Sequence, residues 1–331
     1  MVALADADPA ALAAVRALAP HARVTSRFGD VLEMPDVDAV IIALPPALHA
    51  EAATTALARG KHIYVEKPLA TSVAEARQVV AAWEGTGLVA MMGFNYRRNP
   101  IVQQAREAVR GGAIGKPIAV RTVFATPARA MPAWKHRRDS GGGALLDVAV
   151  HHIDLVRFLL DAEVDTVSAR LESLQSEHDT AFVEMRLTNG CVAQSFFSLS
   201  TVEEDRIEMY GSDAKLTIDR YASLRVDVAA PTAGGALGLS AKRLAREWGA
   251  LPYALRKMRA PLHDPSFPAA LEAFVDAVRN RAPVHPTLDD GARAIAVIDA
   301  AERSAQSRRT VSLETPPFAL DSRPLLDAAR P

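Results

Sequence analysis

The chain of 331 residues contains a single cysteine, Cys191, few aromatic residues and almost no net charge. One thiol cannot form an intrachain disulfide, so a disulfide-stabilised scaffold is excluded and a reducing compartment is favoured. The formal net charge of −1 excludes the global positive field with which proteins hold nucleic acid. No apolar run approaches the ~18 residues of a membrane span, and the N-terminus lacks the basic-then-apolar pattern of a signal peptide. We therefore expect a cytoplasmic protein that has no membrane span and whose partners include no nucleic acid.

The sequence also lacks the glycine-rich turn, G-x-G-x-x-G, that normally opens a dinucleotide-binding domain and receives the pyrophosphate. Residues 85–90 fit the looser G-x-G-x-x-A spacing, but they enter a predicted strand where the motif should leave one. The first apolar run, 2–5, ends at Asp6, as the second strand of such a domain would. We expect the first strand and its turn to be absent from this chain, which leaves strand 2–5 poorly supported beside 37–44.

Strand and helix patterns alternate through the first ninety residues. Short apolar runs bounded by turn residues predict buried parallel strands, and apolar spacings of three and four predict helices. The predicted strands are 2–5, 39–44, 62–65 and 88–92, and the predicted helices are 9–19, 49–59 and one that Ser72 caps with Glu75. This rhythm predicts a Rossmann-type, doubly wound parallel sheet over residues 1–98.

After Pro100 the pattern changes to successive strands. Between 164 and 228, short runs are separated by turn signals, of which Asn189-Gly190 is the clearest hairpin signature. Residues 99–331 are therefore expected to form a second, α+β domain with a largely antiparallel open sheet. Its helices are expected at 101–110, 144–160, 268–280 and 291–303.

One face of the antiparallel sheet is expected to be broad and apolar. Alternating apolar residues need a partner surface, and those that indicate this face are Phe182, Val192, Phe196 and Leu199. We therefore expect a homo-oligomer that forms through this sheet.

A lysine follows one of the predicted parallel strands. Lysines are only seven of the 38 basic residues, and Lys67 lies in Glu66-Lys67-Pro68 at the carboxyl end of strand 62–65, where open α/β sheets bind their ligands. An ammonium group is costly to desolvate unless it is paired or used. Lys67 can therefore exchange a proton with a substrate or polarise a substrate oxygen, and a purely structural role is the alternative.

Asp147 and His151 stand four residues apart in the predicted helix that follows a glycine-rich turn, so both project from one helix face. A carboxylate and an imidazole on one face can share a substrate hydroxyl and its proton. A surface ion pair or a buried structural histidine is the alternative. A metal site of His151, His152 and Asp154 is disfavoured, because His152 points off the shared face, and no metal is expected.

Several ordered segments together resemble the Gfo/Idh/MocA family, whose members include glucose–fructose oxidoreductase and inositol dehydrogenases. Residues 60–70 are similar, almost position by position, to the family signature G-K-H-V-x-x-E-K-P-x-A, and 141–154 are similar to G-G-G-x-L-x-D-x-G-x-H-x-x-D. Further similar segments are 44–49 (T-P-N-x-x-H), 93–97 (G-x-N-x-R), 112–117 (G-x-I-G-x-P) and 289–291, the D-G segment.

The resemblance implies hydride transfer between NAD(P) and a carbon bearing a hydroxyl of a sugar, inositol or related polyol. Lys67 matches the family's catalytic lysine, Asp147 its substrate-orienting aspartate and His151 its acid/base histidine, and all three would contact the substrate. The resemblance also assigns Arg97 to substrate binding. The positions that would line the cofactor are Pro45, His49, Glu66 and Asn95.

Asp6 stands where an acidic side chain would bind the ribose hydroxyls and repel a 2′-phosphate, which favours NAD over NADP. A plain helix-capping role is the alternative for Asp6.

The chain departs from the family pattern in two further places. Ala149 replaces the usual glycine of D-x-G-x-H, and the basic, aromatic-containing segment 232–263 matches no family motif. That segment is interpreted as a solvated basic face, with a lid over an anionic substrate or a membrane-surface helix as alternatives. Besides an oxidoreductase that has a further N-terminal β-α unit, two functions stay open: a non-catalytic or regulatory short form, and a redox-neutral lyase or hydrolase that uses bound NAD.

Overall fold

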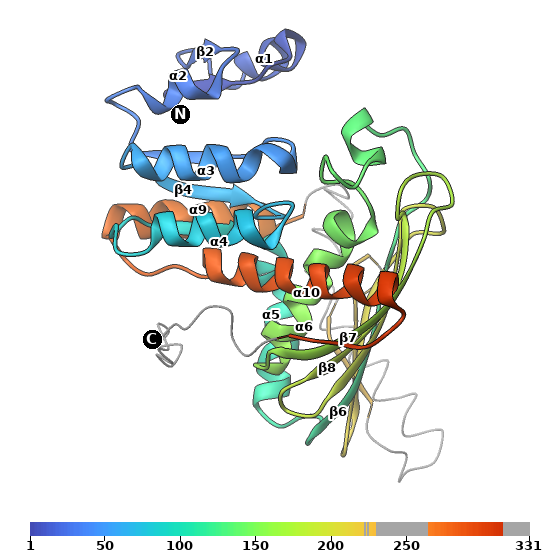
Figure 1. Cartoon of the computed structure of the whole chain (residues 1–331). Helices are drawn as coiled ribbons and strands as arrows, with labels where there is room; N and C mark the ends of the chain where they lie inside the picture. The colour runs from blue at the N-terminus through green and yellow to red at the C-terminus, as the bar shows by residue number, and fades with distance from the viewer. Residues whose placement is uncertain (222, 224, 230–263, 314–331) are drawn as a thin grey trace.

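A computed structural model describes residues 1–221, 223, 225–229 and 264–313 (Figure 1). The basic segment 232–263 lies outside the described residues. Parallel strands and helices form the N-terminal part, and a larger sheet forms the C-terminal part, in agreement with the expected order of an α/β and an α+β region. No helix in the described ranges is long and apolar enough to cross a membrane.

The parallel strands of the N-terminal part form two separate sheets. β1 (Ala3–Ala5) pairs with β2 (Arg23–Thr25), and the other three strands pair in the order β3-β4-β5. Strand β1 has no ladder with β3, so the expected lack of support for this strand beside the 39–44 run is confirmed. The sequence did not predict β2, because three mostly polar residues carry no periodic pattern. The remaining bounds are α1 (Pro9–Arg16), α2 (Phe28–Leu32), β3 (Ala39–Ile42), β4 (His62–Glu66) and β5 (Ala90–Gly93).

Helices cover both faces of strand β4 (Figure 1). Ile63 and Val65 belong to the core that α3 (His49–Ala58) and α4 (Val73–Trp83) cover, whereas Tyr64 packs on Phe274 of α9 (Ser266–Asn280) with ring centroids 5.8 Å apart. The expected helix cap is confirmed, because Ser72 Oγ accepts from Glu75 N at 3.3 Å and Glu75 Oε2 accepts from Ser72 N at 3.0 Å. Helix α9 therefore returns from the C-terminal half to complete the parallel layer.

The C-terminal part contains an eight-stranded sheet in the order β12-β11-β10-β6-β9-β8-β7-β13. Every pair in it is antiparallel except β6 and β9, so the expected largely antiparallel sheet is confirmed. The hairpin at Asn189-Gly190 is also confirmed, and Gly190 has a φ of +86° that suits glycine. The strands are β6 (Pro117–Ala125), β7 (Val164–Glu172), β8 (Thr180–Leu187), β9 (Val192–Ser198), β10 (Glu204–Gly211), β11 (Lys215–Asp219), β12 (Asp227–Ala229) and β13 (Val311–Ser312).

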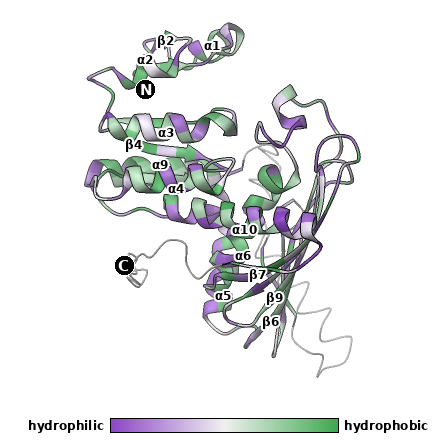
Figure 2. Ribbon diagram, in the orientation of Figure 1, coloured by the Kyte–Doolittle hydropathy of each residue, from purple (hydrophilic) through white to green (hydrophobic). Residues whose placement is uncertain are grey.

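Helices pack on one face of this sheet, and no helix of the described residues covers the other, which is called the open face below. Side chains along β8 alternate between the two, with Met185 fully buried and Phe182 48% exposed. Hydrophilic and hydrophobic residues are both present along the strands of this sheet (Figure 2). The prediction of a broad apolar open face is wrong. Leu199 is buried, and charged residues of β6 and β10 beside the Phe182–Phe196 ring pair interrupt the apolar surface. The packed helices are α5 (Pro100–Arg110), α6 (Val150–Leu160) and α10 (Leu288–Ser307).

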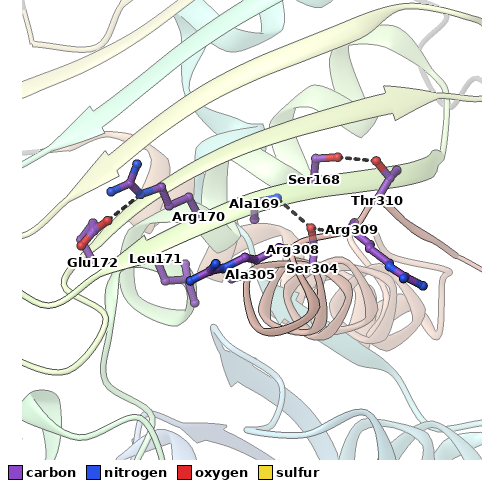
Figure 3. A pocket seen from close by; sticks show the side chains of 10 residues that line it. All are labelled: Ser168, Ala169, Arg170, Leu171, Glu172, Ser304, Ala305, Arg308, Arg309 and Thr310. Atoms are coloured by element: carbon purple, nitrogen blue, oxygen red, sulfur yellow. Dashed lines mark hydrogen bonds and ion pairs between the residues drawn. The ribbon is translucent and has the colours of Figure 1, made fainter.

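Helix α10 spans both parts of the molecule, from α4 and β5 to strand β7 of the large sheet (Figure 1). At its C-terminal end, the hydroxyl of Ser304 accepts a hydrogen bond from Ala169 N of β7 at 3.0 Å (Figure 3). The hydroxyls of Ser168 and Thr310 lie 2.7 Å apart beside it, and a polar pocket opens between the strand and the helix end. These contacts fix the far end of α10 to the sheet.

A buried ion cluster joins three elements near the middle of the molecule. Arg97, on the 3₁₀ turn η2 (Asn95–Arg98) after β5, donates to both oxygens of Asp154 on α6 at 2.6 and 2.8 Å. It also donates to Asp290 of α10 at 2.8 Å. The substrate-binding role predicted for Arg97 does not fit this position, because its guanidinium is buried and held by two carboxylates. Arg97 instead ties the parallel layer to α6 and α10.

We expect Asp154→Asn to lower the free energy of unfolding by about 3 kcal/mol, because a buried charge that loses its partner is strongly destabilising. The measurement is the urea dependence of unfolding. The matched control is Asp299→Asn on the same helix as Asp290, which breaks an exposed pair with Arg303 and should have little effect. Equal losses of unfolding free energy in the two variants would show that the buried cluster stabilises the fold no more than an exposed ion pair does.

Candidate active site

Lys67 and Asp147 meet where the two parts of the molecule come together. Lys67 directly follows β4, and its Nζ donates to the backbone oxygen of Asp147 at 2.7 Å and lies 3.3 Å from Asp147 Oδ1. The two side chains are 19% and 15% exposed. Two residues that the resemblance implies would contact the substrate, 80 positions apart in the chain, thus lie side by side. An ammonium group at the carboxyl end of a parallel strand is thus paired and still reachable by a small molecule.

The backbone around Asp147 is a π-helical turn, η4 (Leu145–Ala149), which leads into α6. Turns of this kind are rare and occur often at functional sites. Ala149, which replaces the usual glycine, is fully buried in this turn. Its methyl group is therefore accommodated by the packing around the turn.

The glycine-rich turn before Asp147 is wedged between two other segments. Gly141 has a φ of +99°, and a Cβ there would lie 2.5 Å from the side chain of Pro46. A Cβ on Gly142 would lie 2.2 Å from the backbone oxygen of Lys135. Only glycine fits both positions. The glycine-rich turn therefore brings Asp147 close to the loop after β3 on one side and to the 133–136 turn on the other.

His151 lies one helical turn beyond Asp147 and is buried. Its imidazole stacks on the ring of Tyr96, with centroids 4.1 Å apart and an interplanar angle of 18°. Burial, and then the positive charges of Lys67 and Arg220, hold the pKa of His151 well below its usual value of 6.5. The imidazole is therefore neutral at neutral pH and can accept a proton.

His152 faces away from this group, as the helical spacing predicted. Its Nε2 lies 3.0 Å from Asp205 Oδ1, and its ring packs between Phe124 and Phe197. Asp205 also accepts from Arg220 at 2.6 Å. Across the part of the chain that the structure describes, no group of histidine, cysteine and acidic side chains is arranged to hold a metal ion.

The predicted cofactor-lining residues fall at the carboxyl ends of the parallel strands. Pro45 follows β3, Glu66 ends β4 and Asn95 follows β5. Burial raises the pKa of Glu66, and the side chain occupies the space where a Cβ on Gly93 would lie. Three of the predicted positions therefore gather at one edge of the β3-β4-β5 sheet.

Asn95 is buried and has one satisfied and one unsatisfied polar atom. Its Nδ2 donates to Ser266 Oγ of α9 at 2.8 Å, whereas Oδ1 has no hydrogen-bond partner among the described residues. A buried acceptor without a donor is unfavourable. An amide or hydroxyl of a nicotinamide cofactor would supply that donor, so the residue fits the group that the resemblance implies.

His49 does not fit the direct cofactor contact predicted for it. The side chain is 1% exposed, and its ring nitrogens lie 2.6 Å from the backbone oxygen of Pro68 and 2.7 Å from that of Leu44. His49 therefore joins the loop after β3 to the loop that carries Lys67, and its role is to position them.

Asp6 lies just after β1, and its Oδ1 accepts from Asp8 N at 2.8 Å. The helix cap of α1 is Asp8, which accepts from Ala10 N at 2.8 Å. The capping role considered for Asp6 therefore belongs to Asp8. The carboxylate of Asp6 is exposed to solvent.

The sequence interpretation missed Lys135 and Tyr96. Lys135, on the 3₁₀ turn η3 (Ala133–His136), places its Nζ 2.8 Å from Asp147 Oδ2. The scarcity of lysine was the available signal, since two of only seven lysines reach one carboxylate. Nothing in the sequence indicates the stacking of Tyr96 on His151, because it depends on how η2 and α6 cross.

Comparison with known proteins agrees with this geometry. The family model described as "Oxidoreductase family, NAD-binding Rossmann fold" matches residues 1–94, and "Oxidoreductase family, C-terminal alpha/beta domain" matches 106–313. Myo-inositol 2-dehydrogenase of Thermotoga maritima is 28% identical over 294 residues, which are 86% of this chain and 82% of that protein. The uncharacterized oxidoreductase YrbE of Bacillus subtilis is 30% identical over 62% of each chain.

The fold also matches solved structures. Levoglucosan dehydrogenase in complex with NADH and levoglucosan superposes with a TM-score of 0.80 at 24% identity, covering 95% of this chain and 90% of that one. Both family models match in the expected order, and together they span the parallel layer and the large sheet. The chain therefore belongs to the Gfo/Idh/MocA family of oxidoreductases.

Proposed function

We propose that this protein transfers a hydride between NAD and a secondary hydroxyl group, or the corresponding ketone, of a sugar, inositol or related polyol. The observation that carries the proposal is the contact of Lys67 with Asp147 beside the buried, neutral imidazole of His151. In this proposal residues 1–98 form the cofactor domain and 99–331 the substrate domain. The named relatives and the family description support the same chemistry.

The proton is handled by residues of this chain. Bound NAD supplies the hydride acceptor, or NADH the donor. Lys67 donates a hydrogen bond to the reacting oxygen and stabilises the negative charge that develops there. His151, held neutral, accepts the hydroxyl proton during oxidation and returns it during reduction. Asp147 accepts hydrogen bonds from the substrate and fixes its orientation.

Two features support the choice of NAD and its mode of binding. The exposed carboxylate of Asp6 after β1 can accept hydrogen bonds from ribose hydroxyls and would repel the 2′-phosphate of NADP. The unsatisfied Oδ1 of Asn95 would accept a hydrogen bond from the cofactor, and Pro45 and Glu66 lie at the same sheet edge.

The open face of the eight-stranded sheet supports a homo-oligomer. It combines the rings of Phe182 and Phe196, which are tilted relative to each other with centroids 5.1 Å apart, with positive and negative side chains that include Arg121, Arg206 and Glu208. A surface with both charges and an apolar centre can complement a second copy of itself in a two-fold dimer.

The single cysteine supports a cytoplasmic location. Cys191 is buried, and burial raises the pKa of its thiol. A buried, protonated thiol is unreactive and suits a reducing compartment, in which structural disulfides are rare.

We expect Lys67→Met to bind NADH nearly as the wild type does but to lose roughly 10²-fold or more in turnover, the usual range for a lost hydrogen-bond donor to a developing oxyanion. Lys67→Arg should not restore turnover, because the guanidinium has a different shape and reach. The measurement is NADH formation with a panel of polyols and sugars, alongside product analysis that separates net oxidation from elimination or hydrolysis. Near-full turnover of Lys67→Met would refute the assignment.

The low pKa of His151 should appear in the pH profile. Since the pKa of His151 lies well below 6.5, its imidazole is neutral at pH 6.5. The kcat/KM for oxidation should therefore still be high at pH 6.5 and fall at lower pH as His151 becomes protonated. His151→Gln should remove the contribution of His151 to this acid limb and reduce turnover roughly 10²-fold. His136→Gln, at an exposed position on η3, is the control and should preserve the wild-type profile. A fall of the wild-type kcat/KM that is centred at or above pH 6.5 contradicts the assignment.

Sedimentation at micromolar concentration should show a dimer or a larger assembly. Phe182→Glu places a charge at the centre of the open face and should shift the equilibrium toward monomer, because a carboxylate is costly to bury without a partner. A wild-type protein that sediments strictly as a monomer argues against the interface.

A further inference from the structure

Two ammonium groups share the carboxylate of Asp147. Lys135 Nζ lies 2.8 Å from Oδ2, whereas Lys67 Nζ lies 3.3 Å from Oδ1 and makes its shorter contact, 2.7 Å, with the backbone oxygen. The shorter ion pair of Asp147 is therefore with Lys135, a residue that the proposed mechanism does not use.

The turn that carries Lys135 is held firmly in place. Gly142 N donates to the backbone oxygen of Arg137 at 2.8 Å, and the missing Cβ of this glycine makes room for the backbone of Lys135. On the other side, Arg138 donates to the backbone oxygen of Thr71 at 3.0 Å and pairs with Glu302 of α10. The ammonium of Lys135 is thus presented to Asp147 from a fixed backbone.

The two lysines contact Asp147 in different ways. An ammonium group has three donors, and Lys67 directs two of them at Asp147. With Lys135 absent, Lys67 would be the sole cation paired with this largely buried carboxylate among the described residues. Coulomb attraction would then draw the Lys67 ammonium onto the Asp147 side chain. The donor that remains for a substrate oxygen would then point elsewhere.

We propose that Lys135 is a positioning residue for hydride transfer, which holds the Asp147 carboxylate so that the Lys67 ammonium stays directed at the substrate. The kinetic effects expected from this inference rest on the proposed function. The change expected in the structure rests on the geometry alone.

The kinetic test compares three variants of the full chain. We expect Lys135→Met to lower kcat at least about tenfold, as misplaced catalytic groups do, with the KM for NAD unchanged. Lys135→Arg keeps the charge and should recover most of kcat. Arg137→Met removes a cation from the same loop, where the side chain pairs with Asp139 on the surface, and should behave as wild type.

The acid side of the pH profile gives a second readout that a merely structural residue would not move. Lys67 and Lys135 together keep the pKa of Asp147 below its usual value against the effect of burial. Removing one cation raises that pKa, so the kcat of Lys135→Met should begin to fall at a higher pH than that of the wild type or Arg137→Met. An unchanged kcat and an unchanged pH profile in Lys135→Met overturn the inference.

A crystal structure of Lys135→Met tests the geometric claim without activity. We expect Lys67 Nζ to lie closer to Asp147 Oδ1 than the 3.3 Å of the wild-type chain. An unmoved Lys67 overturns the inference even if the enzyme is active. If the wild type forms no NADH with any polyol or sugar, the proposed function fails, and the position of Lys67 in the variant still decides the role of Lys135.

Discussion

The ion pair between Lys67 and Asp147 is the contact on which the arrangement of the site depends. An ammonium taken partly out of water at the end of β4 needs a carboxylate, and the chain supplies it from a segment 80 residues away. The parallel layer and the large sheet must therefore be held in one relative position. Helix α10, which runs from one to the other, and the buried carboxylates around Arg97 provide that constraint.

The same packing gives the acid/base group its properties. His151 is covered by Tyr96 and sits near two cations, so the neutral imidazole is favoured by both burial and charge. A histidine on an exposed helix face would be partly protonated near neutral pH. Tyr96 lies on η2, the turn that also carries Arg97. The ion pairs of Arg97 that join the parallel layer to α6 and α10 therefore also hold the Tyr96 ring over His151.

Close packing around two glycines brings Lys135 to the site. Glycines at 141 and 142 let Pro46 and the backbone of Lys135 approach where any side chain would collide. The family-like run of three glycines is thus explained by close contacts on two sides, in addition to its backbone angles. The consequence is a carboxylate held from two directions by ammonium groups of different segments.

Local pattern determined much of this protein. The strand–helix rhythm, the Ser72 cap, the Asn189-Gly190 hairpin and the candidate pair Lys67 and Asp147 all follow from residue spacing and turn chemistry. The motif resemblance added the assignment of roles and the family, which the family models confirm.

Tertiary structure decided what spacing cannot express. Arg97 and His49 occupy motif positions, yet the first is held by two carboxylates and the second by two backbone oxygens. Lys135 joined the site, and the open sheet face carries charges where an apolar stripe was expected. In each case the outcome depends on which long-range partner reaches a side chain once water is excluded, and a linear sequence records the donor and the acceptor without the distance between them.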